Sequence, residues 1–244
     1  MKVAIMQPYF LPYIGYFQLI DSVDLFVIYD NIKYTKKGWI NRNRILQHGQ
    51  PAVISLPLKN DSDALDVVDR QLAAEFSSVK LLNKIAEAYR KAPYFEQALT
   101  VVERIVNHDE RNLFRFLHHA IVETCRYLGI DTKIAIASAF PIDASLKGQD
   151  KVIALCEHAG ADVYVNAIGG VELYSAEAFR SAGLELKFIR SGPFEYRQFG
   201  ETFVPSLSIV DVMMFNPMEV IRRCLASNYD LIPAGVNCQT GSSA

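Results

Sequence analysis

Residues 2–30 read KVAIMQPYFLPYIGYFQLIDSVDLFVIYD, with two short apolar stretches on either side of a loop and a helical pattern. The stretches at 2–6 and 24–30 are rich in β-forming residues, which is typical of buried strands. Residues 15–23 carry apolar side chains at helical spacing. Because a strand–helix–strand unit of this length favours a parallel pair with a right-handed crossover, the sequence predicts an α/β protein. Its sheet is expected to be mainly parallel and flanked by helices.

The same patterns continue along the chain. Further strands are predicted at residues 52–57, 133–137, 162–167 and 186–189, and helices at residues 75–91, 95–106, 110–128, 150–159 and 220–226. Gly129 and Gly160 follow two of these helices, as capping glycines do. Residues 61–74 are acidic and mixed, which predicts a loop or an exposed segment.

The 244 residues fit one α/β domain over 1–235. The helical segment at about 75–130 is expected as an insertion or a subdomain. The tail at 236–244 is rich in Gly and Ser and predicts disorder.

Composition limits the functional classes. The formal net charge is -2, which disfavours a protein whose main role is to bind a nucleic-acid backbone, although a local basic patch is compatible with it. The apolar run at 3–6 ends at Gln7-Pro8, too early for a signal peptide, and no run approaches the length of a membrane span. The four cysteines form no CxxC pair. We therefore expect a cytoplasmic protein with free thiols and no membrane association.

The end of the first strand is crowded with aromatic residues, prolines and a glycine, in the sequence QPYFLPYIGYF at 7–17. Proline and glycine fix the shape of a loop, and tyrosines offer stacking faces and hydroxyl donors for a base or a sugar ring. The alternative is an aromatic lid that belongs to the core. Tyr13-Ile14-Gly15-Tyr16 also resembles the HxGH signature of nucleotidyltransferase-like (HUP-type) folds, with tyrosines in place of both histidines. Tyrosine donates only a neutral hydrogen bond, whereas histidine can also carry a charge that pairs with phosphate. The substitution therefore weakens the prediction of adenylyl transfer more than it weakens the analogy in fold.

A basic segment follows the second strand, in the sequence KYTKKGWINRNR at 33–44. Cationic side chains around the lone tryptophan suit a nucleotide diphosphate or the end of a tRNA, although a solvated face is the plainer reading. Asp30 ends the strand before it. This carboxylate is a candidate for binding ribose, an ammonium group or Mg²⁺, or for capping a turn.

Motifs later in the chain are less specific indications of a functional site. Asn166-Ala167-Ile168-Gly169-Gly170 follows a strand, where successive backbone N–H groups can hold an anion. Ser208 and Asp211 have capping-box spacing. The histidines are scattered, and no metal site is predicted.

Together these segments resemble the WbqC-like family. The resemblance rests on residues 6–17, 26–30 and 37–42, then on Lys151, Gly169-Gly170, Tyr174 and LSIVD at 207–211, and it extends from residue 1 to about 225. It implies a bacterial protein from a gene cluster for O-antigen or capsular polysaccharide, where dideoxy amino sugars on dTDP or UDP are modified at the amine. For relatives, it implies transfer of an amino acid, notably glycine, to that amine.

Our first hypothesis is therefore an amide-forming transferase, an aminoacyl or acyltransferase or an ATP-dependent amide ligase, acting on a nucleotide-linked amino sugar. The donor is either ATP with Mg and a free amino acid, or aminoacyl-tRNA. The alternatives are a non-catalytic nucleotide-sugar-binding or assembly protein of the same pathway, and a sugar nucleotidyltransferase. The candidate catalytic residues are Asp30, Tyr13 and Gln7. The candidate substrate- or nucleotide-binding residues are Tyr9, Gly15, Tyr16, Lys36, Trp39, Asn41, Arg42, Lys59, Asn60, Gly169, Gly170 and Tyr174.

Overall fold

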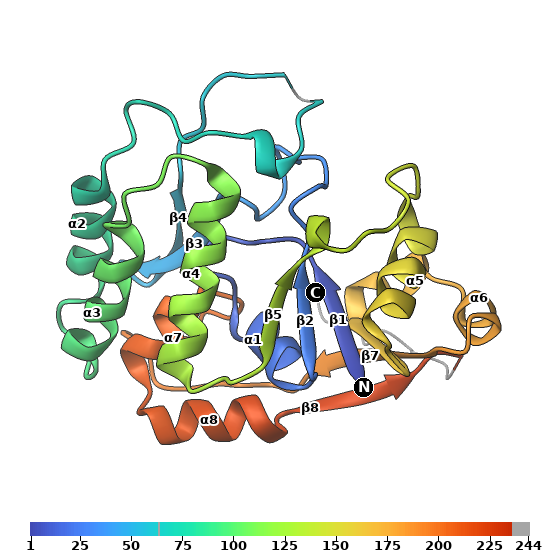
Figure 1. The fold of residues 1–244 in the computed structure, drawn as a ribbon. Helices are drawn as coiled ribbons and strands as arrows, with labels where there is room; N and C mark the ends of the chain where they lie inside the picture. Colours follow the sequence, from blue (N-terminus) through green and yellow to red (C-terminus); the bar gives the residue numbers. More distant parts are fainter. Residues whose placement is uncertain (63, 236–244) are drawn as a thin grey trace.

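The computed structural model describes residues 1–62 and 64–235, and Figure 1 shows a central sheet with helices on both sides. Within these residues, the sheet has six strands in the order β5-β2-β1-β6-β7-β8. Neighbouring strands are parallel except β7 and β8, which are antiparallel. The α/β class with a mainly parallel sheet is confirmed. The predicted tail lies outside the described residues.

The sheet strands are β1 (Lys2–Met6), β2 (Leu25–Ile28), β5 (Lys133–Ile136), β6 (Val163–Ala167), β7 (Glu185–Ser191) and β8 (Tyr229–Pro233). A separate antiparallel hairpin is formed by β3 (Arg42–Gln47) and β4 (Gln50–Ser55). The helices are α1 (Ile14–Asp21), α2 (Ser78–Tyr89), α3 (Phe95–Val106), α4 (Leu113–Leu128), α5 (Gly148–Ala159), α6 (Ala176–Ser181), α7 (Ile209–Phe215) and α8 (Met218–Ser227). Short 3-10 turns are η1 (Val67–Asp69), η2 (Ala137–Ala139) and η3 (Ile168–Leu173).

Both faces of the sheet are covered, because successive side chains of a strand point to opposite faces. On β1, Val3 and Ile5 belong to a buried cluster with Leu155 of α5, whereas Ala4 belongs to a cluster with Phe17 of α1. The second cluster also contains side chains of α3 and α4, such as Leu117. The helical segment between β2 and β5 therefore shares a core with one face of the sheet (Figure 1).

Most predicted elements are present, and their ends shift by a few residues. Gly129 and Gly160 do cap α4 and α5, and both are left-handed, with φ of 72° and 71°. Of the two alternatives for 61–74, a loop fits the 3-10 turn and isolated bridges found there, whereas an exposed segment is wrong for the second half. Val67 and Leu72 are buried there, because backbone bridges join Leu58 with Leu72 and Gln71 with Asn112. Apolar residues held by a 3-10 turn and isolated bridges have no period that a sequence pattern can reveal.

The order of the strands creates a crevice beside β1. From β1 the chain moves outward to β2 and β5, and then crosses back to place β6 on the other side of β1. The ladder between β1 and β6 pairs only Lys2 with Val163 and Val3 with Tyr164, whereas β1 and β2 are paired as far as Met6. The carboxyl ends of β1 and β6 are therefore not held together. Ligands of doubly wound sheets bind at such a switch point.

Candidate functional site

A cavity of about 950 Å³ lies at this switch point. It is lined by the ends of β1 and β6, the loop after β1, the start of the loop after β2, and the start of α5. Of the residues selected from the sequence, eight line it: Gln7, Tyr9, Tyr13, Gly15, Tyr16, Gly169, Gly170 and Tyr174. Its size and its mixture of rings, amides and charges are those of a small-molecule site.

The tyrosines of the first loop differ in their roles. Tyr16 is buried, and its hydroxyl donates to the carbonyl of Gln7 at 2.9 Å, so it fixes the backbone where β1 ends. Tyr9 packs against Tyr16, with ring centroids 5.7 Å apart. Tyr13 is 43% exposed, and its side chain is hydrogen-bonded to Ser191. Burial raises the pKa of Tyr9 and of Tyr13, so both phenols are neutral donors at pH 7.

Gly15 is required by the position of the Tyr13 ring. A Cβ at residue 15 would lie 2.4 Å from Cε2 of Tyr13 and 2.6 Å from Oγ of Ser191. The ring therefore packs directly on the glycine backbone at the start of α1. The Tyr13-Ile14-Gly15-Tyr16 pattern thus holds one phenol against the helix and the other under the loop.

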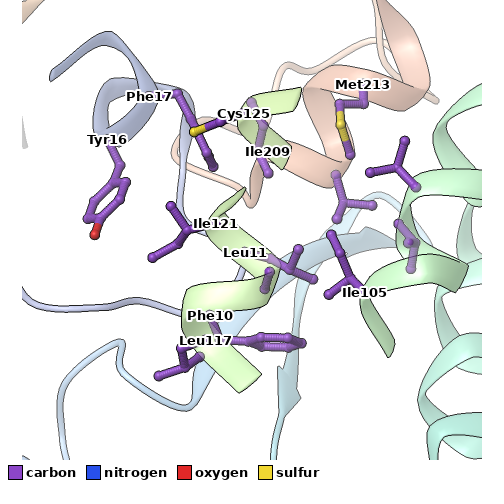
Figure 2. Close-up of a cluster of buried hydrophobic side chains, with 14 of the residues drawn as sticks. Phe10, Leu11, Tyr16, Phe17, Ile105, Leu117, Ile121, Cys125, Ile209 and Met213 are labelled. Carbon is purple, nitrogen blue, oxygen red and sulfur yellow. The ribbon is translucent and has the colours of Figure 1, made fainter. Parts of the chain in front are cut away.

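The tip of this loop, at Phe10 and Leu11, belongs to the hydrophobic core. The alternative of an aromatic lid that is part of the core is therefore correct for this part of the loop. Figure 2 shows Phe10 and Leu11 among Leu117 and Ile121 of α4. Leu11 has a φ of 45°, which is unfavourable for a residue with a side chain. Asn43 holds it there by donating to the carbonyls of Phe10 at 3.0 Å and Leu11 at 2.8 Å. Ser208 also donates to the carbonyl of Leu11, at 2.7 Å.

The opposite wall is formed after β6. Asn166 is buried, and its Oδ1 accepts from the N–H of Ala167 at 2.7 Å. A Cβ at Gly170 would lie 2.9 Å from Nδ2 of Asn166, whereas a Cβ at Gly169 would meet nothing within 4 Å. Tyr174 closes this wall, with its hydroxyl 3.3 Å from that of Tyr164. Gly170 thus permits close packing, and Gly169 leaves open space.

The cavity has polar residues that were not selected from the sequence. Lys151 donates to the Oδ1 of Asn31 at 2.8 Å and to its carbonyl at 3.1 Å, and its Nζ lies 5.2 Å from the centre of the Tyr29 ring. Burial lowers the pKa of Lys151, and the carboxylates of Asp66 and Asp30 oppose this. Asp66, Lys147 and Gln149 are further wall residues of this kind. Lys33 and Asn166, which belong to segments that the sequence did indicate, also line the cavity. Lys151 was signalled only by the family resemblance, and Asn31 only by its place after a strand.

Asp30 is brought close to the cavity but does not line it. It is 3% exposed, and its Oδ1 accepts from the N–H of Ser138 at 3.0 Å. Its carbonyl accepts from the N–H of Val68 at 3.1 Å. Asp30 therefore joins β2 to the segments after β4 and β5. Asp66 is the carboxylate that the described cavity wall contains.

The basic segment lies outside the cavity beyond Lys33. Arg42 donates to the carbonyls of Gly38 and Lys36, both at 2.9 Å, and so clamps the turn at 35–38. Asn41 accepts from the hydroxyl of Tyr34 and donates to the carbonyl of Leu56, each at 2.8 Å. Trp39 is exposed, with the guanidinium of Arg44 5.2 Å from its ring centre. Lys59 and Asn60 line a second, more open cavity with Arg111.

Ser208 and Asp211 do not form a capping box. Ser208 is the N-cap of α7 and accepts from the N–H of Val210 at 3.2 Å, which confirms the cap. Asp211 instead accepts hydrogen bonds from Tyr89, Tyr196 and Gln198, at 2.8, 2.6 and 2.7 Å. The Asp211 carboxyl group therefore bonds to α2 and to the segment after β7, and not to the backbone at the start of α7.

Side chains typical of metal sites are dispersed. Across residues 1–62 and 64–235, no three His, Cys, Asp or Glu side chains are grouped to hold a metal ion. Cys125, Cys156 and Cys224 are buried free thiols, and burial raises the pKa of Cys125 and of Cys156 to about 12. None of the helices in that part of the chain has both the length and the apolar character of a membrane span.

An uncharacterized protein of Mycobacterium tuberculosis is 28% identical over 218 residues, which cover 88% of this chain and 93% of that protein. No solved structure matches the chain, so the nucleotidyltransferase-like analogy stays a prediction. The matched residues of the family profile are 7–223, which include the first-loop and β6 walls of the cavity. The chain therefore belongs to the WbqC-like protein family.

Proposed function

We propose that the cavity binds a nucleotide-linked amino sugar and that the protein transfers an acyl group to its amine. The observation that supports this most is the cavity itself, which combines tyrosine faces, amide side chains and lysines at the switch point of a doubly wound sheet. Rings of this kind pack on sugars and bases, amides bind hydroxyl groups, and lysines bind phosphates. With the family resemblance, this favours a dTDP- or UDP-linked amino sugar of O-antigen or capsule synthesis.

The reaction needs a neutral amine, an activated carbonyl and an acceptor for one proton. A C–N bond forms between the sugar nitrogen and the acyl carbon, and the bond from that carbon to the donor oxygen breaks. The wall offers Asp66 as a proton acceptor and neutral phenols, such as Tyr13, as donors to the developing oxyanion. Asp30, behind the wall, orients the segment that carries Asn31.

The donor is either ATP with a free amino acid or aminoacyl-tRNA, and glycine is the first acyl group to test. Mg²⁺ that arrives with ATP needs only one or two protein carboxylates, because phosphates and water supply its other ligands. On that route Asp66 would bind Mg²⁺ rather than the amine proton, which the leaving phosphate can accept. An ATP route would supply an activated acyl phosphate anhydride at this wall.

Thermal stability in the presence of ligands tests the acceptor site. Saturation at about 100 times Kd adds about 2.7 kcal/mol to the free energy of unfolding. A dTDP- or UDP-amino sugar should raise Tm more than dTDP or UDP alone, and amide product should form with one of the two donors. Equal shifts for the sugar nucleotide and the bare nucleotide would count against an amino-sugar site.

A second function is favoured by the environment of Asp30. Its carboxylate is buried and bonded to the backbone, as in a structural acid. A protein that only binds the sugar nucleotide would show the same rise in Tm with no amide formed under either donor. Asp30→Asn would then change affinity without abolishing a reaction.

A further inference from the structure

Two exposed aromatic rings lie on neighbouring segments of the surface. Within the described residues, the aromatic side chains that are exposed are Tyr13 and Trp39, each at 43%. Tyr13 lines the cavity, and Trp39 lies outside it. The two segments are tied together, because the N–H of Phe10 donates to the carbonyl of Trp39 at 3.3 Å. Phe10 directly follows Tyr9, a wall residue.

Contacts made by two arginines constrain the position of Trp39. Arg42 clamps the preceding turn, and Arg44 lies against the indole while donating to the carbonyl of Ser206 at 3.2 Å. A partner that stacks on this fixed ring would remove apolar surface from water, which favours binding. Since Trp39 is 43% exposed, part of the ring is open to a partner.

The charge around this ring is positive. Residues 33–44 contain five cationic side chains and no carboxylate, although the chain as a whole has a net charge of -2. Lys33 lines the cavity, Lys37 is exposed two residues before Trp39, and Arg44 lies against the indole, so the segment between the cavity and the ring carries cations along the chain. We call Lys33, Lys37, Trp39 and Arg44 the Trp39 surface. A fixed ring with flanking cations is how proteins bind single-stranded nucleic acid, with a base on the ring and phosphates on the cations.

We propose that the Trp39 surface binds the single-stranded end of an RNA, which presents its terminal ribose to the cavity. The identity of the group that the RNA carries rests on the proposed acyl transfer, whereas RNA binding does not. In that reaction, the acyl carbon leaves the ester oxygen of the terminal ribose and bonds to the sugar nitrogen. The ester oxygen takes up the proton that the nitrogen loses. Amide and free RNA are the products, and no further reactant is needed.

The chain carries its own reporter, because Trp39 is its single tryptophan. We would titrate the full chain with deacylated tRNA and with a single-stranded RNA about eight nucleotides long, and record indole fluorescence. Stacking should quench it. With three phosphate contacts, the affinity should fall about twentyfold between about 50 and about 200 mM salt. A duplex of the same sequence should bind at least about tenfold more weakly, since its bases are not free to stack.

Variants separate stacking from charge, with the anisotropy of labelled RNA as the readout. Trp39→Ala should weaken binding about tenfold or more, and Trp39→Phe should restore part of it. Lys37→Glu should weaken binding and flatten the salt dependence, whereas the same change at the exposed Lys91 should do neither. The inference is overturned if neither RNA quenches Trp39, if the duplex binds equally well, or if Lys37→Glu and Lys91→Glu behave alike.

The acceptor assay keeps the two proposals distinguishable. A rise in Tm with an amino-sugar nucleotide but no quenching by RNA would overturn this inference and leave the acceptor site standing. Quenching by RNA without a rise in Tm would support the Trp39 surface and remove the proposed acceptor. Transfer of glycine from glycyl-tRNA that is lost in Trp39→Ala would support both.

Discussion

At the scale of single residues, the cavity is shaped by close contacts more than by charge. The phenol of Tyr16 holds the carbonyl of Gln7, and the ring of Tyr13 packs on Gly15. Lys151 has a defined position in the cavity wall, because two oxygen atoms of Asn31 and the Tyr29 ring surround its ammonium. Each of these contacts can be altered separately.

Lys151→Met should remove most of the affinity for a sugar nucleotide while leaving the fold intact. A hydrogen bond to a charged group contributes about 1.5–3 kcal/mol, so Kd should rise about ten- to a hundredfold. Isothermal titration calorimetry measures this. Lys151→Arg should keep part of the affinity. Lys147→Met is the matched control, since Lys147 also lines the cavity but its side chain makes no hydrogen bond or ion pair with residues 1–62 or 64–235. Equal losses in both variants would show that the position of Lys151 is unimportant.

Gly15→Ala should displace the Tyr13 ring, because the new Cβ would lie 2.4 Å from it. We expect weaker ligand binding and a change in the ultraviolet absorbance of tyrosine, with an approximately unchanged circular dichroism spectrum. Gly169→Ala is the control, since its Cβ would meet nothing within 4 Å. If both alanine variants bind ligand like the parent, the Tyr13 ring is not part of the site.

At the scale of elements, the site depends on how the first loop is anchored. Asn43 of β3 and Ser208 before α7 both donate to the carbonyl of Leu11. They come from elements 32 and 197 residues away along the chain. The hairpin β3–β4 and α7 therefore position a loop that begins at the end of β1.

Asn43→Ala should destabilise the protein by about 2–4 kcal/mol, because it leaves the buried carbonyl of Phe10 without a donor and weakens support for the left-handed Leu11. Urea unfolding measures the loss. Asn60→Ala, at an exposed position, should change stability by less than about 0.5 kcal/mol. A loss at Asn43 no larger than at Asn60 would mean that the loop does not need this anchor.

The sequence allowed prediction of β1, β2 and β4 to β7, of most helices and of the first-loop wall, since these depend on local periodicity and on strands whose carboxyl ends share one edge. It did not indicate β3 or β8. It could not place Arg42 or Asn41, because cations and amides have the same pattern whether they bind a ligand or clamp a backbone turn. Asp211 shows the same limit. Its spacing from Ser208 indicated a cap, and only the tertiary fold brings Tyr89 and Gln198 to it.

At the scale of the whole molecule, Asp211 ties three distant parts together. It accepts from Tyr89 of α2 and from Tyr196 and Gln198 of the segment after β7, while Tyr89 also accepts from the N–H of Leu46 in β3. Burial raises the pKa of Asp211, although the three hydrogen bonds act to lower it. The pKa of Asp211 is therefore higher in the folded chain than in the unfolded one.

The raised pKa of Asp211 predicts the direction in which stability changes with pH. A carboxyl whose pKa is raised by folding contributes most stability below its unfolded pKa, and that contribution is lost as pH rises through its folded pKa. The difference in unfolding free energy between the parent and Asp211→Asn should therefore be largest in acid and shrink as pH rises from about 4. Urea titrations across that range measure it. A difference that grows with pH would contradict the raised pKa.

The central position of β1 has a consequence for synthesis of the chain. One edge of β1 pairs with β2, which follows within thirty residues, but its other edge waits for β6 at Val163. A ribosome that adds about 5–20 residues per second needs about 8–30 s to cover that interval. During this time one edge of the apolar strand β1 has no partner strand. Chaperone demand should therefore be highest before β6 emerges, and a translational pause upstream of β6 should lower the yield of folded protein more than one downstream.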